Sequence, residues 1–334
     1  MYILIAILVL GLLILVHELG HFCVGRWCGI KVLEFSIGFG PKLLHWGKGE
    51  TQYSLRLIPL GGFCRFLGED EDGVREAGSM LSATVWQRIA TLLAGPACNL
   101  LLAVSLASVF MWINGTYVPQ VVQIEPYSKA FQAGLQTGDI LREVDGKDIL
   151  SFMEIKQALT QAGDPVQLTV SRGKERLSLS IPRVEQEGKQ ILGISYQGTK
   201  EDFSLINATR FGCRWLGMVT KSMFGALGDL FTGQAEQGTV VGPVGTITLI
   251  AQEAQTGWLN MLLLMAMLSL NLGIFNLLPI PGLDGGRLIF LLYELVRGKP
   301  FPPEKEGVVH LVGMVILFGL MILLTFSDVR SLFA

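Results

Sequence analysis

The sequence predicts an α-helical polytopic membrane protein with about four transmembrane helices, a β-hairpin and one extramembrane α+β domain. Two observations predict this class. Half of the 334 residues are apolar and only 16% are charged, whereas about 25% are charged in typical soluble proteins. The apolar residues also form four stretches that are long enough for helices crossing a hydrocarbon layer of about 30 Å. These stretches cover residues 2–24, 89–113, 258–278 and 308–326.

The composition excludes several other classes of protein. The apolar content is too high for intrinsic disorder. A net charge of −2 argues against a nucleic-acid partner, which normally requires a basic face. The five cysteines include no CxxC pair, so we predict packing thiols rather than a disulfide framework or a four-cysteine zinc site.

The first membrane part is expected over residues 1–114, with spans at 2–24 and 89–113. No Lys or Arg precedes the first stretch and no small-residue cleavage site follows it, so we interpret it as a retained helix rather than a signal peptide. Basic residues gather in the loop 25–88 and again between residues 287 and 307. Because basic loops stay in the cytoplasm, this pattern predicts that both termini and the central domain lie outside.

The loop 25–88 contains a predicted β-hairpin. Apolar side chains recur at every second position on both sides of the glycine-rich segment 47–50. The first run includes Phe35, Ile37 and Phe39, and the alternation resumes after residue 52. Period-two alternation around such a segment is typical of two paired strands.

The motif HELGH at residues 17–21 is the strongest chemical signal in the chain. Positions i and i+4 lie on one side of a helix, so His17 and His21 can share a zinc ion, and Glu18 is placed to take a proton from a water on that metal. The alternative is two hydrogen-bonded histidines at a helix end. The motif ends a 15-residue apolar run, where three ionisable groups are costly unless they have a function.

A catalytic zinc usually has three protein ligands and one open position. The remaining candidates are His45 in a polar loop, His310 in the fourth stretch and Asp284 in the segment 276–286. Prolines 279 and 281 break the helix just before Asp284, and unwound backbone at membrane depth is tolerated where it lines a cavity. From spacing alone, Asp284 is either the third ligand or a cap of the following helix.

The central domain is expected at residues 115–190. Its segment 128–146 closely resembles the core of a PDZ domain, with a short helix, a turn at Gly138–Asp139 and a hairpin at Asp145–Gly146. PDZ folds commonly accept an extended peptide along a sheet edge. The alternative is a domain that only blocks access sterically.

A connecting amphipathic helical segment is expected at 191–256, before the second membrane part at 257–334. Residues 203–231 combine helical spacing of apolar residues with little charge. This helix either lies on the outer membrane surface or packs against the PDZ-like domain. Within the second span, the pattern GPxxN at residues 95–99 favours close helix contact, with Asn99 as a polar contact across the bundle.

These motifs together resemble the site-2 protease family of intramembrane metalloproteases, in its bacterial RseP-type branch. The resemblance rests on HExxH in a first span, NxxPxPxLDGG at residues 276–286 after a third span, and a PDZ-like domain between the second and third. It implies that His17, His21 and Asp284 bind Zn2+, that Glu18 is the general base and that Asn276 contacts the substrate. It also implies a hairpin that dips into the membrane beside the site. The chain departs from the best-studied enterobacterial pattern, because it has room for one PDZ-like domain where that pattern has two, and this argues against a size filter built from two domains.

The resemblance implies regulated intramembrane proteolysis in a bacterial inner membrane, with the PDZ-like domain outside the cytoplasm. The expected substrates are transmembrane segments of single-span proteins, such as anti-sigma factors or remnant signal peptides. Two alternatives stay open. One is a non-enzymatic membrane adaptor that binds peptides in a PDZ groove. The other is a membrane metalloprotease that cleaves non-membrane chains, with Glu294 as its third ligand.

Overall fold

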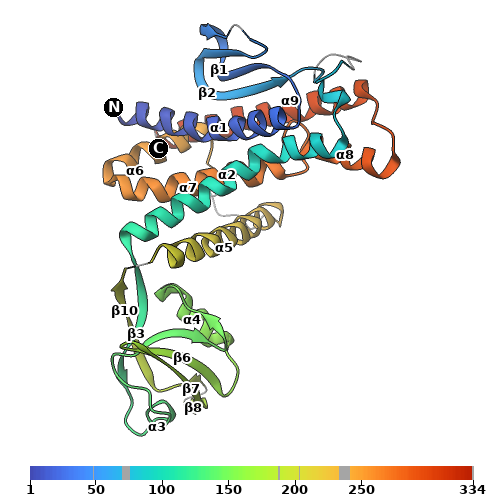
Figure 1. Cartoon of the computed structure of the whole chain (residues 1–334). Coiled ribbons are helices and arrows are strands. Elements are labelled where there is room, and N and C mark those ends of the chain that lie inside the picture. The colour runs from blue at the N-terminus through green and yellow to red at the C-terminus, as the bar shows by residue number, and fades with distance from the viewer. Residues whose placement is uncertain (48, 70–75, 187–188, 203, 233–240, 333–334) are drawn as a thin grey trace. The chain divides into compact units, whose positions relative to one another are not determined.

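The computed structural model describes residues 1–47, 49–69, 76–186, 189–202, 204–232 and 241–332. These residues form two compact units (Figure 1). The first unit combines Met1–Ala107 with Cys213–Ala334, and the second unit is Ser108–Gly212.

The first unit is mainly helical. Its helices are α1 (Tyr2–Trp27), α2 (Val85–Asn114), α5 (Leu205–Thr232), α6 (Pro243–Thr256), α7 (Trp258–Leu277), α8 (Asp284–Arg297) and α9 (Pro303–Leu332), with a short 3-10 helix at Met80–Ser82 before α2. Within the described residues, α1, α2, α7 and the segment Lys305–Arg330 of α9 are long and apolar enough to cross a membrane. These are the four helices that the apolar stretches predict. Three of them extend beyond the predicted limits, because backbone hydrogen bonding continues through polar residues at the helix ends. The helix α7 instead ends at Leu277, one residue before its predicted limit.

A two-stranded antiparallel hairpin follows α1, as the alternation predicts. Its strands are β1 (Val32–Trp46) and β2 (Gln52–Phe66), and Lys48 of the predicted turn lies outside the described residues. The strand β2 packs along α1, and the ring of Phe35 meets that of Phe22 on α1 at 5.2 Å. Beyond this contact the hairpin exposes Phe39 and several further apolar side chains, among them Leu43, Leu44, Trp46 and Leu57.

The helix α6 begins within the GPVG segment 242–245 and packs against α1, α7 and α9. Its Ile250 is fully buried among Ala6, Val9 and Leu13 of α1. The helix α5 packs Trp215 and its neighbours at 216, 219 and 223 against apolar side chains of α2 and α7. The apolar face predicted for this helix is therefore covered at least in part by the membrane-type helices.

The second unit contains a six-stranded sheet with two short helices. The order of its main strands is β10-β3-β4-β6-β7, and β5 pairs with β4. The bounds are β3 (Thr116–Ile124), α3 (Lys129–Gln132), β4 (Ile140–Val144), β5 (Lys147–Asp148), α4 (Phe152–Gln161), β6 (Val166–Arg172), β7 (Glu175–Ile181) and β10 (Ile194–Glu201), with a separate small pair β8 (Val184–Gln186) and β9 (Lys189–Ile191).

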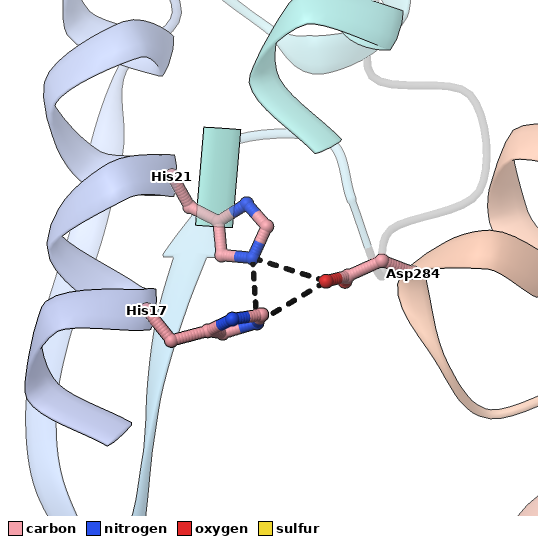
Figure 2. A group of neighbouring side chains, drawn as sticks. All are labelled: His17, His21 and Asp284. Carbon is pink, nitrogen blue, oxygen red and sulfur yellow. Dashed lines mark hydrogen bonds and ion pairs between the residues drawn. The ribbon is translucent and has the colours of Figure 1, made fainter. Parts of the chain in front are cut away.

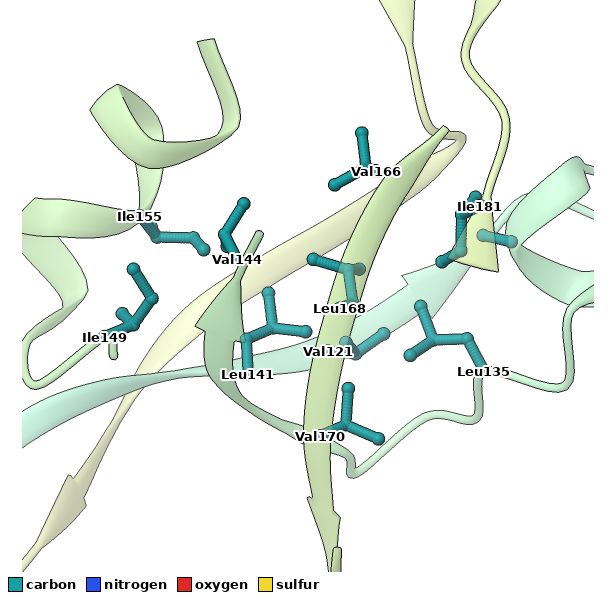
Figure 3. Close-up of a cluster of buried hydrophobic side chains, with 11 residues drawn as sticks. Val121, Leu135, Leu141, Val144, Ile149, Ile155, Val166, Leu168, Val170 and Ile181 are labelled. Carbon is teal, nitrogen blue, oxygen red and sulfur yellow. The ribbon is translucent and has the colours of Figure 1, made fainter. Parts of the chain in front are cut away.

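One apolar core holds the second unit together (Figure 3). Its side chains come from alternate positions of the strands and from the inner faces of the helices, as period-two and period-3.6 burial requires. They are Val121, Ala130, Leu135, Leu141, Val144, Ile149, Ile155, Val166, Leu168, Val170 and Ile181.

The sheet extends past the expected domain limit at residue 190. The strand β10 pairs antiparallel with β3, from Ile194 beside Ile124 to Glu201 beside Thr116. Its residues therefore belong to this sheet rather than to a helical connection. Local sequence pattern does not reveal a pairing between segments that lie about seventy residues apart.

The pair Asp139–Arg172 joins β6 to the turn before β4. Asp139 is 1% exposed, and the Arg172 guanidinium donates to both of its carboxylate oxygens at 2.8 and 2.7 Å. Burial raises the pKa of Asp139, but hydrogen bonds from Arg172 and from the Gln136 N–H outweigh burial and hold that pKa below its usual value. The ionised form is therefore favoured in the folded unit.

We expect Arg172→Met to destabilise the second unit by about 2 kcal/mol at pH 7, because a charged hydrogen-bond pair loses its donor. A lowered carboxyl pKa stabilises the fold above the unfolded value of about 3.9, and this contribution is lost as pH falls through the folded pKa. The acid-side loss of stability should thus be smaller in Arg172→Met than in the wild type. Urea unfolding of the full chain, with pulsed hydrogen exchange of β4 as readout, measures both. The exposed Arg176→Met is the matched control, and equal behaviour of the two variants would contradict the prediction.

Candidate metal centre

The helix α1 carries His17 and His21 on one face, one turn apart (Figure 2). Both side chains are buried. The glycine between them at position 20 allows α2 to approach, because a Cβ at Gly20 would lie 2.7 Å from the carbonyl carbon of Ala94. The sequence thus places both imidazoles in the contact between two apolar helices.

The turn between α7 and α8 brings Asp284 to the same point. Asp284 is the first residue of α8, and its predecessor Leu283 is the N-cap residue, with no side-chain capping bond. Its Oδ2 lies 3.2 Å from His17 Nε2 and 3.3 Å from His21 Nε2. Asp284 is therefore not the N-cap of α8, the alternative that spacing had left open, and its carboxylate faces the two histidines instead.

The three atoms form a nearly equilateral triangle whose third side, between His17 Nε2 and His21 Nε2, is 3.1 Å. Ligands at about 2.0–2.1 Å from a tetrahedral zinc ion lie about 3.3 Å apart. Oδ2 of Asp284 is buried and has no hydrogen-bond donor assigned to it. The donor set and its spacing therefore fit a zinc ion with a fourth position open. Within the described residues, no other group of His, Cys, Asp and Glu converges in this way.

The far nitrogen of each imidazole also has a partner. His21 Nδ1 lies 2.8 Å from the backbone oxygen of Thr91 and donates to it, which leaves Nε2 free to bind a metal. His17 Nδ1 lies 3.2 Å from the side-chain amide of Asn99, whose Oδ1 is buried without a donor. The oxygen and the nitrogen of that amide fit this position equally well. When Nε2 of His17 binds a metal, its Nδ1 carries the proton and donates, so the amide oxygen must face Nδ1.

Three positions on α2 therefore support the site. The GPxxN pattern predicted close helix contact at Gly95 and a polar contact at Asn99, but not that the two histidines are their partners. Thr91, Gly95 and Asn99 are spaced by four residues and form one stripe along the helix. A Cβ at Gly95 would lie 2.6 Å from His21 Cε1. Small and polar residues at i, i+4 and i+8 in an otherwise apolar span are the signal that identifies this stripe.

We expect Gly95→Ala to weaken zinc binding at least tenfold, because the added methyl group occupies the place of the His21 imidazole. Zinc content and zinc affinity of the purified protein measure the effect. Gly228→Ala on α5, where a Cβ meets nothing within 4 Å, is the control. Full zinc occupancy in Gly95→Ala would show that His21 is held elsewhere.

The two other predicted site residues are Glu18 on α1 and Asn276 on α7. Glu18 is half-buried on α1 and faces β2, where a Cβ at Gly62 would lie 3.4 Å from its Cγ. Asn276 lies in the last turn of α7, and its Nδ2 donates to the backbone oxygen of Leu272 at 2.9 Å.

The alternative ligands lie apart from the triangle. His45 is exposed on β1, and His310 Nδ1 accepts a hydrogen bond from the Gly282 N–H. Glu294 accepts a hydrogen bond from Arg88 of α2 at 2.6 Å, and both side chains are largely buried. Glu294 is therefore paired with Arg88 and does not face the two histidines, so it is not the third ligand in this structure.

Comparisons with known proteins identify relatives of this chain. A predicted zinc metalloprotease of Clostridium perfringens is 38% identical over 98% of this chain and 98% of its own length. The regulator of sigma-W protease RasP of Bacillus subtilis is 31% identical over 98% of each chain. Among solved structures, the HtrA3 PDZ domain matches 18% of this chain and 58% of its own chain at 31% identity, with a TM-score of 0.17.

The family model covers almost the whole chain. The model for peptidase family M50 matches residues 5–320, a range that includes the three converging side chains. Several relatives, among them the Clostridium perfringens protein, are named as zinc metalloproteases, so Zn2+ is the cofactor of this family. The chain belongs to peptidase family M50, the site-2 protease family, and is a zinc metalloprotease of the RseP-like kind.

Proposed function

We propose that this chain is a zinc-dependent intramembrane endopeptidase that cleaves transmembrane segments of single-span proteins. The observation that carries the proposal is the convergence of His17, His21 and Asp284 inside a bundle of membrane-type helices. His17 lies 16 residues from Met1, which is about 24 Å along a helix. In a layer of about 30 Å that depth is within the membrane, towards the cytoplasmic side.

In this proposal His17, His21 and Asp284 are the zinc ligands. A zinc ion held there supplies a Lewis acid that polarises a carbonyl and lowers the pKa of a bound water. Glu18 accepts the proton of the attacking water and passes it to the leaving amine. Asn276 lies in the last turn of α7, just before the turn that carries Asp284. In this proposal its amide holds the substrate backbone near the scissile bond.

The hairpin β1–β2 supplies the partner for an unwound substrate. A peptide bond within a helix is shielded, so a substrate helix must unwind, and its freed N–H and C=O groups need partners in lipid. The strand β2 passes beside Glu18, and strand addition to the hairpin would satisfy those groups. The exposed apolar side chains of the hairpin support its place in the membrane.

We place the PDZ-like unit outside the cytoplasm, following the basic loops. Its strand β10 is at the end of the sheet order, and the ring of Tyr196 on β10 meets that of Phe152 on α4 at 5.8 Å. An extended peptide can add to such an edge. Peptide capture there and steric exclusion of intact ectodomains are both compatible with this position.

The substrates proposed are anti-sigma-factor-like proteins and remnant signal peptides in a bacterial inner membrane. The name of the Bacillus relative, regulator of sigma-W protease, supports the first of these. Both are short single-span proteins once their outer parts have been removed, so the outer unit does not exclude them.

Reconstitution into lipid vesicles tests the proposal. The full chain with zinc should cut a single-span substrate within its apolar segment, and mass spectrometry of the fragments locates the cut. The same cleavage sequence in a soluble, unfolded chain should stay intact. Cleavage of the soluble chain alone would instead favour a metalloprotease of non-membrane substrates, and zinc binding without any cleavage would favour an adaptor.

A further inference from the structure

The segment that presents Asp284 pairs all but one of its backbone N–H groups locally. Residues 278–283 connect α7 to α8 and include two prolines, which have no N–H to donate. The N–H groups of Leu278, Ile280 and Leu283 donate to carbonyl oxygens of neighbouring residues at 2.7–3.1 Å. The N–H of Gly282, two residues before Asp284, donates instead to a side chain of another helix.

That side chain is His310 of α9. Its Nδ1 accepts from the Gly282 N–H at 3.0 Å, so the neutral ring carries its proton on Nε2. Only 13% of the His310 side chain is exposed, and its ring meets that of Phe290 on α8 edge-on at 5.5 Å. His310 therefore touches both the turn and the helix on either side of Asp284.

Close packing fixes α9 against the same turn. A Cβ at Gly313 would lie 2.5 Å from the carbonyl carbon of Pro281, and a Cβ at Gly282 would lie 3.2 Å from Met314 Cγ. Elsewhere the apolar segment of α9 is little covered, with 6% of it buried. A polar side chain on such a helix is costly unless it has a partner. The contact with Gly282 is that partner.

We infer that His310 is a positioning residue, which anchors the Gly282 N–H and thereby holds Asp284 toward His17 and His21. Without this acceptor, an N–H group at membrane depth would have no partner, and the turn would rearrange to find one. The inference rests on the proposed ligand set, because it assigns to His310 the placement of the third ligand. His310 itself is not one of the three converging side chains.

Variants of His310 separate the hydrogen bond from packing. His310→Phe keeps a ring against Phe290 but has no acceptor, and His310→Leu removes both. His310→Asn keeps an acceptor, because its Oδ1 occupies nearly the position of Nδ1. The exposed His45→Leu is the matched histidine control.

Zinc affinity, measured on the full chain in detergent by competition with a chelator, is the readout. We expect roughly tenfold or greater weakening in His310→Phe and His310→Leu, and affinity within about threefold of wild type in His310→Asn and His45→Leu. The melting temperature of the metal-free protein is measured in parallel. A positioning role predicts that His310→Asn restores affinity even where all three His310 variants melt at the same lowered temperature.

Two results would overturn the inference. One is unchanged zinc affinity in His310→Phe. If that variant does not fold, unchanged affinity in His310→Leu has the same meaning. The other is equal weakening in His310→Phe and His310→Asn, which would indicate packing alone. Asp284→Ala in the same titration tests the ligand set separately: if it keeps full affinity, the proposed ligand set fails, whatever the His310 variants show.

Discussion

Replacement of Glu18 by Gln is expected to lower the cleavage rate by about 10²–10⁴-fold while zinc stays bound. A general base contributes roughly this factor, and the glutamine side chain has the same size but cannot accept the proton. Glu18 is adjacent to His17 on α1 but is absent from the triangle of metal-binding atoms. The substitution therefore removes the proposed proton acceptor and keeps the proposed ligands.

The measurement combines zinc content of the purified protein with cleavage of a single-span substrate in vesicles. Glu253→Gln on α6, whose carboxylate accepts a hydrogen bond from Thr256, is the matched control and should cleave at the wild-type rate. A Glu18→Gln protein that cleaves normally would refute the mechanism, and one that has lost zinc would show that Glu18 is a ligand.

The features that the sequence predicted are those encoded within a few residues. Four apolar stretches predicted four membrane-type helices, and period-two alternation predicted the hairpin β1–β2. The spacing of His17 and His21 placed both imidazoles on one side of α1. Each of these depends on a local repeat that matches the period of a helix or a strand.

The features that the sequence missed depend on contacts between distant segments. The pairing of β10 with β3 spans about seventy residues, and the ion pair of Arg88 with Glu294 spans about two hundred. The support that α2 gives to His17 and His21 is of the same kind, because the GPxxN pattern predicts close contact at Gly95 but does not reveal which side chain it contacts. For Asp284, spacing left a ligand and a helix cap as equals, since only the position of the turn relative to α1 distinguishes them.

Asp284→Ala is the second change with a large expected effect. The binding free energy of a tightly held zinc ion is about 10–16 kcal/mol. Divided among four ligands this is about 3 kcal/mol each, so loss of one ligand should weaken zinc binding by at least about a hundredfold. Chelator competition on the purified protein measures this, and cleavage should be lost with the metal.

Glu294→Ala is the informative comparison, because Glu294 is the only alternative carboxylate that the sequence offered as a third ligand. Its partner Arg88 is 10% exposed, so this variant leaves a buried guanidinium without its carboxylate and should destabilise the protein. Its zinc affinity should nevertheless stay close to wild type, since Glu294 lies outside the triangle. If instead zinc stays bound in Asp284→Ala and is lost in Glu294→Ala, the metal is held by a different set of residues, and a protease of non-membrane chains becomes the better interpretation. The two variants therefore distinguish a metal centre completed by the α7–α8 turn from one completed by the last turn of α8.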